Sequence, residues 1–174
     1  MKKYNTVFIA FGSNKGNEIQ NIKNALKQAQ KFCEIKQISP LFISKPEGYL
    51  NQKDFTNGVF KAQTSLTPQE LLNALKQVEK QLGRKETFRN APREIDLDII
   101  FYGDIILQEP LLIIPHKSFS QREFVLAPLA EIAPDFKEPV AGKTIKQLLE
   151  QLRQNKPQST VIKLNKKSPD TPGI

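Results

Sequence analysis

The spacing of apolar residues changes along the first part of the chain from a strand period to a helix period. The β-branched and aromatic run from Thr6 to Phe11 predicts a strand, which Gly12-Ser13-Asn14 interrupts. An amphipathic helix is predicted from Asn17, because apolar residues then recur at helical spacing, at Ile19, Ile22, Leu26, Ala29 and Cys33.

Two more strands and a second helix are predicted next. Residues 34–45 favour a strand that is interrupted near Ser39-Pro40, and residues 55–64 favour another after a polar loop. Thr67-Pro68-Gln69-Glu70 combines a capping box with proline at the first helical position. Gly83 is suited to the end of this helix, whose apolar stripe would consist of Leu71, Leu72, Leu75, Val78 and Leu82.

The second half of the chain is less regular. A polar, basic loop over residues 84–92 precedes a strand predicted from Ile95 to Tyr102. A turn then leads into a short strand from Ile105 to Leu107. Helices are expected within residues 118–133 and after Thr144, where the inward-facing side chains would be Ile145, Leu148, Leu149 and Leu152.

This order of elements predicts an α+β fold. Hairpin-like connections and only two early helices favour a ferredoxin-like core with a mainly antiparallel sheet flanked by helices. We expect a single domain over residues 1–158 and a C-terminal tail over residues 159–174. Within that tail, Thr160 to Leu164 could add one strand before a flexible end.

Composition narrows the class of protein. The 174 residues carry a net charge of +8 and one cysteine, Cys33. The charge favours anionic partners such as nucleotides or phosphorylated metabolites, although solvated surface lysines account for it equally well. No stretch approaches the roughly 18 to 20 apolar residues of a membrane span, and we expect no secretory signal. We therefore expect a cytoplasmic protein without a membrane partner, and the single cysteine fits a reducing compartment.

Two aspartates in the strand after the basic loop are the clearest chemical signal. Because side chains alternate along a strand, Asp96 and Asp98 should share one face while Ile95, Leu97 and Ile99 share the other. Neighbouring carboxylates repel each other, and Mg²⁺ relieves that repulsion while also binding substrate phosphates. The alternative is a half-exposed strand whose aspartates face solvent and bind no metal. The arginines nearby favour the metal site.

Basic side chains surround this aspartate pair in the sequence, namely Arg84, Lys85, Arg89, Arg93, His116 and Arg122. Guanidinium forks suit phosphate oxygens, and a polyphosphate needs several donors at once. Each arginine alone is more typical of a surface ion pair, so the clustering carries the prediction. A histidine-based zinc site is excluded because the chain has one histidine. Glu79, at the border of the second helix's apolar stripe, is expected at the surface.

Other nucleotide-binding and catalytic motifs are absent from the sequence. Neither Gly-x-x-x-x-Gly-Lys-Ser/Thr nor Gly-x-Gly-x-x-Gly occurs, and no motif supports a covalent Ser/His/Asp mechanism. Two alternatives stay open from the residues alone. One is a nucleic-acid-binding module, which the lack of an aromatic RNA-binding motif disfavours. The other is a different Asp-x-Asp metal enzyme, such as a nucleotidyltransferase.

Seven short motifs follow one another in order: Phe11-Gly12-Ser13-Asn14, Ser44 to Gly48, Asp54-Phe55-x-Asn57, Glu79-x-x-x-Gly83-Arg84, Pro92 to Asp98, Ile114-Pro115-His116 and Arg122 to Pro134. Together they resemble the 6-hydroxymethyl-7,8-dihydropterin pyrophosphokinase family over about Val7 to Pro139. The resemblance implies transfer of diphosphate from ATP to 6-hydroxymethyl-7,8-dihydropterin, with release of AMP, in folate biosynthesis. We expect a monomer that binds these two substrates and no nucleic acid.

The resemblance also implies roles for individual residues. The catalytic residues would be Asp96, Asp98, Arg93 and Arg84, with Asp96 and Asp98 binding two Mg²⁺ ions. ATP would be bound by Glu79, Arg84, Lys85, Arg93, Ile99, Leu112, His116 and Arg122, with Ile99 and Leu112 at the adenine. The pterin would be bound by Ser44, Pro46, Phe55, Asn57, Asp96 and Phe124. The two phenylalanines would stack on its faces, and Asn57 would hydrogen-bond its edge.

The departures from the family pattern concentrate in the basic loop. Residues 85–91 are fewer than in some members, and Asn90 stands where some carry a bulky aromatic residue. A second arginine just after Arg84 is missing, and Lys85 is its candidate substitute. Phe55 stands where a tyrosine also occurs in the family. These differences concern loop closure and leave the expected reaction unchanged.

Overall fold

The central element is an antiparallel sheet, as the sequence predicts. The structure, a computed structural model, describes residues 3–156 and 158–165. The sheet runs in the order β5-β1-β4-β3-β8, and β2 also pairs with β4. Its strands are β1 (Asn5–Ser13), β2 (Glu34–Ile38), β3 (Phe42–Ser44), β4 (Phe55–Thr64), β5 (Asp96–Tyr102) and β8 (Val161–Lys163).

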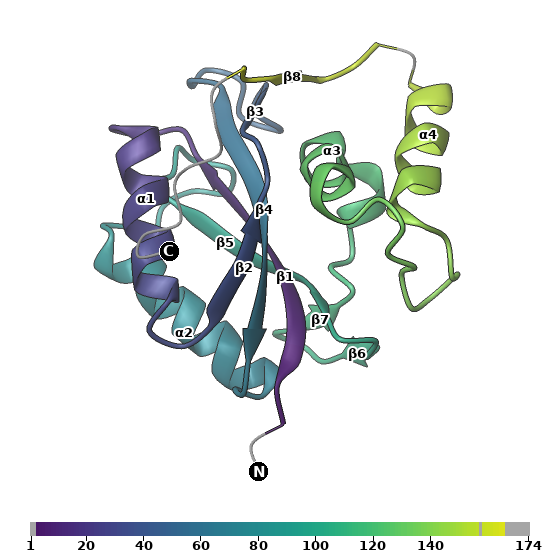
Figure 1. Cartoon of the computed structure of the whole chain (residues 1–174). Coiled ribbons are helices and arrows are strands. Elements are labelled where there is room, and N and C mark those ends of the chain that lie inside the picture. The colour runs from purple at the N-terminus through teal and green to yellow at the C-terminus, as the bar shows by residue number, and fades with distance from the viewer. Residues whose placement is uncertain (1–2, 157, 166–174) are drawn as a thin grey trace.

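Helices cover both faces of this sheet (Figure 1). One face carries α1 (Glu18–Ala29) and α2 (Pro68–Gln81), and the other carries α3 (Glu123–Ile132) and α4 (Ile145–Asn155). The order β1-α1-β2-β4-α2-β5, with β1 and β4 central, is that of a ferredoxin-like core. The predicted α+β class is therefore confirmed.

Local sequence signals fix where α1, α2 and α4 begin. The Asn17 side chain caps α1 by accepting a hydrogen bond from the Gln20 backbone N–H at 3.0 Å. The capping box predicted at Thr67 and Glu70 is present in both directions, and a second one begins α4 at Thr144 and Gln147.

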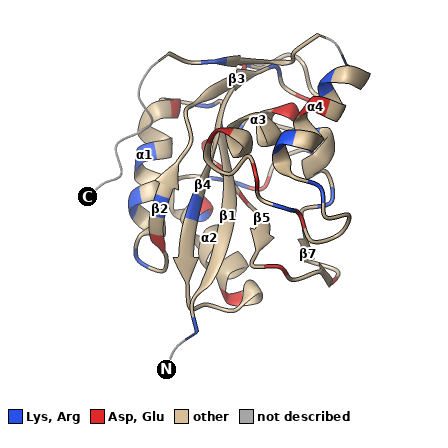
Figure 2. Ribbon diagram, turned by 45° about the vertical axis from the view of Figure 1, so that its right-hand side comes forward, with Lys and Arg blue, Asp and Glu red and all other residues tan. Residues whose placement is uncertain are grey.

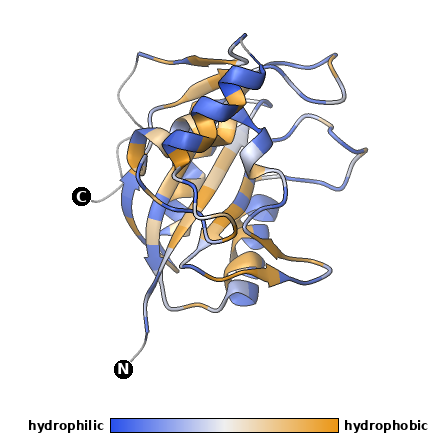
Figure 3. Ribbon diagram, turned by 90° about the vertical axis from the view of Figure 1, so that its right-hand side faces the viewer, coloured by the Kyte–Doolittle hydropathy of each residue, from blue (hydrophilic) through white to orange (hydrophobic). Residues whose placement is uncertain are grey.

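Two apolar clusters lie on opposite faces of the sheet. The cluster under α1 and α2 includes Val7, Ile9 and Leu97, and the cluster under α3 and α4 includes Phe8 and Phe101. Seen from the α3 and α4 side, the strands are mostly apolar and the long edge loops mostly hydrophilic (Figure 3). Because both faces are covered, β1 and β5 are apolar on both sides except where polar residues face the site described below.

The region after β5 departs from the prediction in detail. The short strand expected from Ile105 to Leu107 is displaced, since β6 is Leu107–Gln108 and pairs with an unpredicted β7, Ile113–Ile114. Strands of two residues are too short to show a period of two. The helix expected within 118–133 consists of a short 3₁₀ turn, Phe119–Gln121, and α3.

The C-terminal stretch contributes one edge strand. Val161–Lys163 forms β8, within the stretch where an added strand was considered, and it pairs antiparallel with β3. The expectation of a flexible end concerns residues 166–174, which lie outside the described residues. In the part of the chain that the structure describes, no helix is long and apolar enough to cross a membrane.

Lysine and arginine positions are distributed over helices on both sides of the sheet, with acidic positions between them (Figure 2). This arrangement fits the solvated-lysine explanation of the net charge better than a continuous basic stripe for nucleic acid.

Candidate active site

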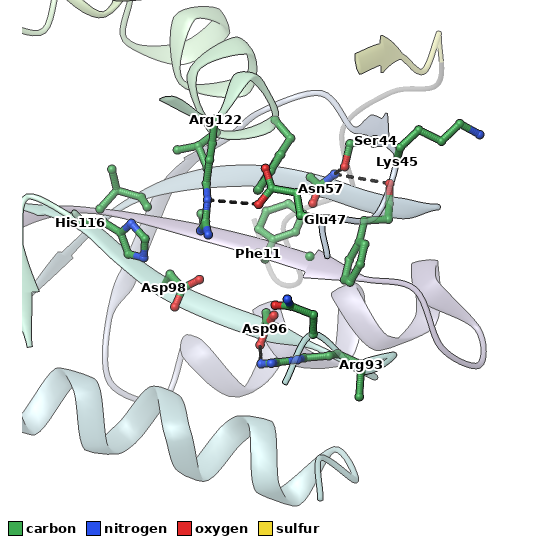
Figure 4. Close-up of a pocket in the computed structure, with 18 residues that line it drawn as sticks. Phe11, Ser44, Lys45, Glu47, Asn57, Arg93, Asp96, Asp98, His116 and Arg122 are labelled. Atoms are coloured by element: carbon green, nitrogen blue, oxygen red, sulfur yellow. Dashed lines mark hydrogen bonds and ion pairs between the residues drawn. The ribbon is translucent and has the colours of Figure 1, made fainter. Parts of the chain in front are cut away.

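One cavity gathers residues from six parts of the sequence on the α3 and α4 side of the sheet. It lies where β1 ends and where β4 and β5 begin, beside the N-terminus of α3 (Figure 4). The predicted site residues that line it are Ser44, Phe55, Asn57, Arg93, Asp96, Asp98, His116, Arg122 and Phe124. The sheet order therefore brings both halves of the expected site, acidic and aromatic, into one space.

The aspartate pair has the alternation that the sequence predicts. Ile95, Leu97 and Ile99 are buried, whereas Asp96 and Asp98 line the cavity. Figure 4 shows the two carboxylates side by side along β5. The Asp96 Oδ1 atom lies 2.9 Å from Nη1 of Arg84 and 2.9 Å from Nη1 of Arg93. Two arginines thus neutralise Asp96 in this structure.

Glu79 is buried, and the expectation of a surface position is wrong. Its side chain is 2% exposed, because α2 packs against β5 and turns this carboxylate towards the strand. Oε1 accepts a hydrogen bond from the Leu97 backbone N–H at 2.8 Å, and Oε2 pairs with Arg84. Burial raises the pKa of Glu79 above its ordinary value, while Lys76, the Leu97 N–H and Arg84 act in the opposite direction. The carboxylate therefore links Arg84 to the strand of the aspartate pair.

Neutral hydrogen bonds organise the opposite wall of the cavity. Asn57, on β4, is 4% exposed and donates from Nδ2 to the Ser44 Oγ atom at 2.8 Å. Gly12 gives this amide its space, since a Cβ there would lie 2.9 Å from the Asn57 Oδ1 atom. The rings of Phe55 and Phe124 line the same cavity. Aromatic walls beside a fixed amide suit a flat heteroaromatic ligand.

Arg122 and His116 add cationic and imidazole groups at the α3 side. Arg122 Nε lies 3.6 Å from Glu47 Oε2, and its guanidinium carbon lies 5.6 Å from the Phe124 ring centroid. His116 Nδ1 accepts a hydrogen bond from the Ser118 backbone N–H at 3.2 Å, which leaves Nε2 as the protonated nitrogen of the neutral ring. Burial lowers the pKa of His116, and Arg122 and Lys117 add to this, although Asp98 opposes it.

A second hollow adjoins the first along α2 and the basic loop. It is lined by four residues assigned to ATP, which are Glu79, Arg84, Lys85 and Arg93. Arg93 lines both spaces. The other cationic side chains of the hollow are Lys15, Lys76, Lys80 and Arg89. A polyanion that reached from the first space into the second would meet several of these cations.

Three predicted residues lie away from both spaces. Pro46 is buried and lines a smaller hollow beside the α3 N-terminus, which also includes Ser44. Ile99 and Leu112 belong to the apolar cluster under α1 and α2, where they are 4% and 7% exposed. Ile99 faces that cluster because it continues the alternation of Ile95 and Leu97.

Sequence reasoning missed several side chains that shape the cavity, including Phe11, Lys45, Glu47 and Asn90. It also missed the structural role of Asn14. This residue is part of the Phe11-Gly12-Ser13-Asn14 motif, but it was not assigned to either substrate. Asn14 Nδ2 donates to Gln52 Oε1 at 2.7 Å, and Asn14 Oδ1 accepts from the Arg93 backbone N–H at 2.8 Å. Its place directly after β1 and two residues after Gly12 is the local signal that could have indicated a link between loops.

The donor set of the cavity fits magnesium. The described residues contain no cluster of three or more histidine, cysteine, aspartate or glutamate side chains suited to a metal. Mg²⁺ commonly uses one or two protein carboxylates and takes its other ligands from water and substrate phosphates. Asp96 and Asp98, which share one face of β5 and line the cavity, supply such a pair.

Comparisons with known proteins agree with this geometry. Residues 8–134 match the family described as 7,8-dihydro-6-hydroxymethylpterin-pyrophosphokinase. The 2-amino-4-hydroxy-6-hydroxymethyldihydropteridine pyrophosphokinase of Aquifex aeolicus is 45% identical over 142 residues, which are 82% of this chain and 89% of that protein. The Pseudomonas aeruginosa protein of the same name is 40% identical over 145 residues, 82% of this chain and 89% of the relative.

A solved structure shows the same fold at much lower identity. The wild-type HPPK-DHPS of Plasmodium falciparum has a TM-score of 0.74 and 17% identity, and it covers 94% of this chain. This chain spans 48% of that longer protein. The matched residues contain the whole aspartate strand and both walls of the cavity, and this chain belongs to the 7,8-dihydro-6-hydroxymethylpterin-pyrophosphokinase family.

Proposed function

We propose that this protein transfers a diphosphate group from ATP to 6-hydroxymethyl-7,8-dihydropterin, giving AMP and the pterin diphosphate, in folate biosynthesis. The observation that carries the proposal is the single cavity that joins Asn57 and two phenylalanines to Asp96 and Asp98. One wall suits a flat heteroaromatic ring, and the other suits a metal-bound polyphosphate. The names of its relatives at 40–45% identity support the same reaction.

The pterin would lie between the aromatic side chains of Phe55 and Phe124. Asn57 and Ser44, already hydrogen-bonded to each other, would pair with the polar edge of the ring. Pro46 would support this wall from the neighbouring hollow, and Asp96 would lie near the hydroxymethyl group. Since these polar groups are fixed before the ligand arrives, little ordering accompanies binding on this side.

The ATP phosphates would be bound by Arg84, Lys85, Arg93, His116 and Arg122, with Glu79 orienting Arg84. The adenine of ATP would contact Ile99 and Leu112, to which the resemblance assigns it. Asp96 and Asp98 would bind two Mg²⁺ ions. When bound, these ions would neutralise phosphate charge and orient the phosphates.

In the reaction, the pterin hydroxymethyl oxygen forms a bond to the β-phosphorus of ATP. The bond between that phosphorus and the oxygen bridging to the α-phosphate breaks, AMP leaves, and the alcohol loses its proton. Such a transfer depends on positioning and on neutralised charge more than on covalent participation by the protein. The cationic side chains that line the two hollows can supply both.

A product assay tests this function. Purified protein, ATP, Mg²⁺ and the reduced pterin alcohol should give AMP and the pterin diphosphate in equal amounts. Omission of the pterin should abolish AMP formation, and addition of a chelator should do the same. Release of inorganic diphosphate instead of AMP would indicate a nucleotidyltransferase and overturn the proposal.

We also propose that the protein acts as a monomer in the cytoplasm. The cytoplasmic location is supported by the cysteine content. The chain has one cysteine and therefore no internal disulfide, as is usual for proteins of a reducing compartment. Size-exclusion chromatography with light scattering would test the first part. A stable dimer at micromolar concentration would contradict it.

A further inference from the structure

Glu123 is a buried carboxylate next to the cavity but outside the residues that line it. It is the first residue of α3 and stands between Arg122 and Phe124, which both line the cavity. Its side chain is 6% exposed. A buried carboxylate is costly unless donors satisfy it, so its partners show what it does.

Among the described residues, the donors to Glu123 all come from the C-terminal part of the chain. Oε1 accepts hydrogen bonds from Arg153 Nε at 2.9 Å and from Ser159 Oγ at 2.9 Å. Oε2 accepts from the Thr160 backbone N–H at 2.8 Å and from Thr160 Oγ1 at 3.0 Å. Burial acts to raise the pKa of Glu123, but these hydrogen bonds outweigh it and leave the pKa below its ordinary value. The carboxylate is therefore ionised at neutral pH.

The segment that Glu123 binds continues into the edge strand of the pterin wall. Directly after Thr160, β8 pairs with β3 so that Val161 faces Ser44 in the register. Ser44 accepts the hydrogen bond from Asn57. The three residues of β8 are half-buried or exposed, so the strand buries little apolar surface of its own. The ties of Glu123 thus secure the end of β8 that lies beside Ser44.

We propose that Glu123 is a positioning residue that sets the spacing between Phe124 and Ser44, which would both contact the pterin. Its carboxylate joins the α3 N-terminus, which carries Phe124, to the C-terminal segment, which supports Ser44 through β3. The inference rests on the proposed function, because it takes the pterin as the ligand of that cavity. It concerns pterin binding and leaves unaffected the ATP-binding side chains of the second hollow, Glu79, Arg84, Lys85 and Arg93, which lie on none of the elements that Glu123 joins.

Variants of Glu123 and of its partner test this role. Glu123→Ala removes all four hydrogen bonds, and Glu123→Gln keeps the shape while losing the charge. Thr160→Val removes one donor at a position that lies outside the pterin cavity. Glu131→Gln is the matched control, because Glu131 also joins α3 to β8 through Lys163 at 2.7 Å but is 34% exposed and does not line the cavity. An exposed pair of this kind contributes little.

The readouts are the pterin Kd by calorimetry with a non-hydrolysable ATP analogue, the ATP Kd, and kcat and KM for the pterin. We expect Glu123→Ala to raise the pterin Kd and KM on the order of tenfold, since buried hydrogen bonds are lost. The ATP Kd and the saturated kcat should change by less than about twofold, as should every value for the Glu131→Gln control. Thr160→Val should shift the pterin Kd in the same direction by less, and its effect should be non-additive with Glu123→Gln.

Each outcome decides the inference. Amide exchange at Val161 to Lys163 should increase in Glu123→Ala together with the loss of pterin affinity. A lower Tm with an unchanged pterin Kd would show a merely structural residue and overturn the proposal, as would equal losses of pterin and ATP affinity. If Glu123→Ala does not fold, Glu123→Gln and Thr160→Val give the same comparison. An active wild type with unaltered variants would refute this inference alone, whereas a wild type that binds no pterin would refute the proposed function as well.

Discussion

The two walls of the cavity are built on different physical principles. On the amide wall, Asn57 and Ser44 are buried in the sheet and bonded to each other without any charge. On the ionic wall, Asp96 pairs with Arg84 and Arg93, and Arg84 also pairs with Glu79. The first wall has groups fixed in place, whereas the second has charges that satisfy one another.

This difference bears on how each substrate would bind. A ligand on the amide wall finds its partners already oriented by backbone pairing between β3 and β4. A metal-bound phosphate on the ionic wall has to replace arginine as the partner of Asp96, after which Arg84 and Arg93 become free for phosphate oxygens. We therefore expect the amide wall to stay unchanged on binding and the ionic wall to rearrange.

The largest expected effect breaks the ionic wall. Asp96→Asn or Asp98→Asn should leave the protein folded and lower turnover by a factor on the order of a hundred or more, because metal positioning contributes several kcal/mol. Steady-state kinetics together with thermal melting would measure both. Asp104→Asn, at an exposed turn, is the control and should change neither turnover nor melting temperature. Near-normal turnover of both site variants would remove the metal assignment.

The next effect separates the amide wall from the ionic wall. Asn57→Ala should weaken pterin binding by about 1–3 kcal/mol, because the polar edge of the ligand loses a buried partner. ATP affinity should hardly change. Titration calorimetry with each ligand would show the difference, and Asn24→Ala on α1, remote from the cavity, is the matched control. Equal losses for both ligands would contradict the division of the cavity into two walls.

A third prediction concerns the basic loop over residues 84–92, which borders the ionic wall. Phe88 is its one large apolar side chain, and it is 57% exposed and touches Tyr49 at 5.1 Å between ring centroids. Few apolar contacts give low local stability, so the free enzyme should exchange these amides readily. Bound nucleotide with magnesium supplies partners for Lys85 and Arg89, and we expect the loop to close over it and exclude water.

Amide exchange measured with and without a non-hydrolysable ATP analogue plus the pterin would test this closure. Protection should rise over residues 84–92 and stay level over β4. If it does not rise, and if turnover survives Lys85→Ala and Arg89→Ala, the loop is a plain connector.

The smallest expected effect is a lowered pKa of His116, at the α3 side of the cavity. His116 is the only histidine, so its ring gives a single set of NMR signals. Because burial lowers the pKa of His116, the ring in the folded protein should titrate below the ordinary value of about 6.5. When urea unfolds the protein, the pKa should rise to that ordinary value. The neutral ring should be the tautomer protonated at Nε2, since Nδ1 accepts from Ser118.

The sign of the stability effect follows from the direction of this shift. Stability from neutral His116 is fully present above about pH 6.5 and is lost as the pH falls towards the lower folded-state pKa, because the unfolded chain binds the proton first. His116→Gln should lack this loss in thermal melts between pH 7 and pH 5. An ordinary pKa in the folded protein would contradict the prediction.

Local sequence patterns predicted much of the fold. The helix starts at Asn17, Thr67 and Thr144 follow from side chains that cap the backbone within three residues. The alternation from Ile95 to Ile99 is sufficient to place both aspartates on one face of the strand. The bounds of β6 were predicted wrongly and β7 was not predicted, because two residues define no period.

Residues that satisfy distant backbone groups could not be predicted. Glu79 looks like a surface residue by its helical position, yet the packing of α2 against β5 gives it the Leu97 N–H to bind. Glu123 likewise gains its four hydrogen bonds from residues thirty or more positions away. A helix or strand period records only which face of an element is apolar, and it contains no information about these partners.

The sequence by itself thus determined most of the elements, the aspartate pair and, through its ordered motifs, the family. Only the tertiary structure decided which charges neutralise one another, that Glu79 is buried, and that the C-terminal strand pairs with β3, which carries Ser44. The physical reason is the range of the interactions. Helix caps and the spacing of apolar residues depend on residues that are close in the sequence, so they can be predicted from it. Ion pairs and edge-strand pairing join segments that only the folded chain brings together.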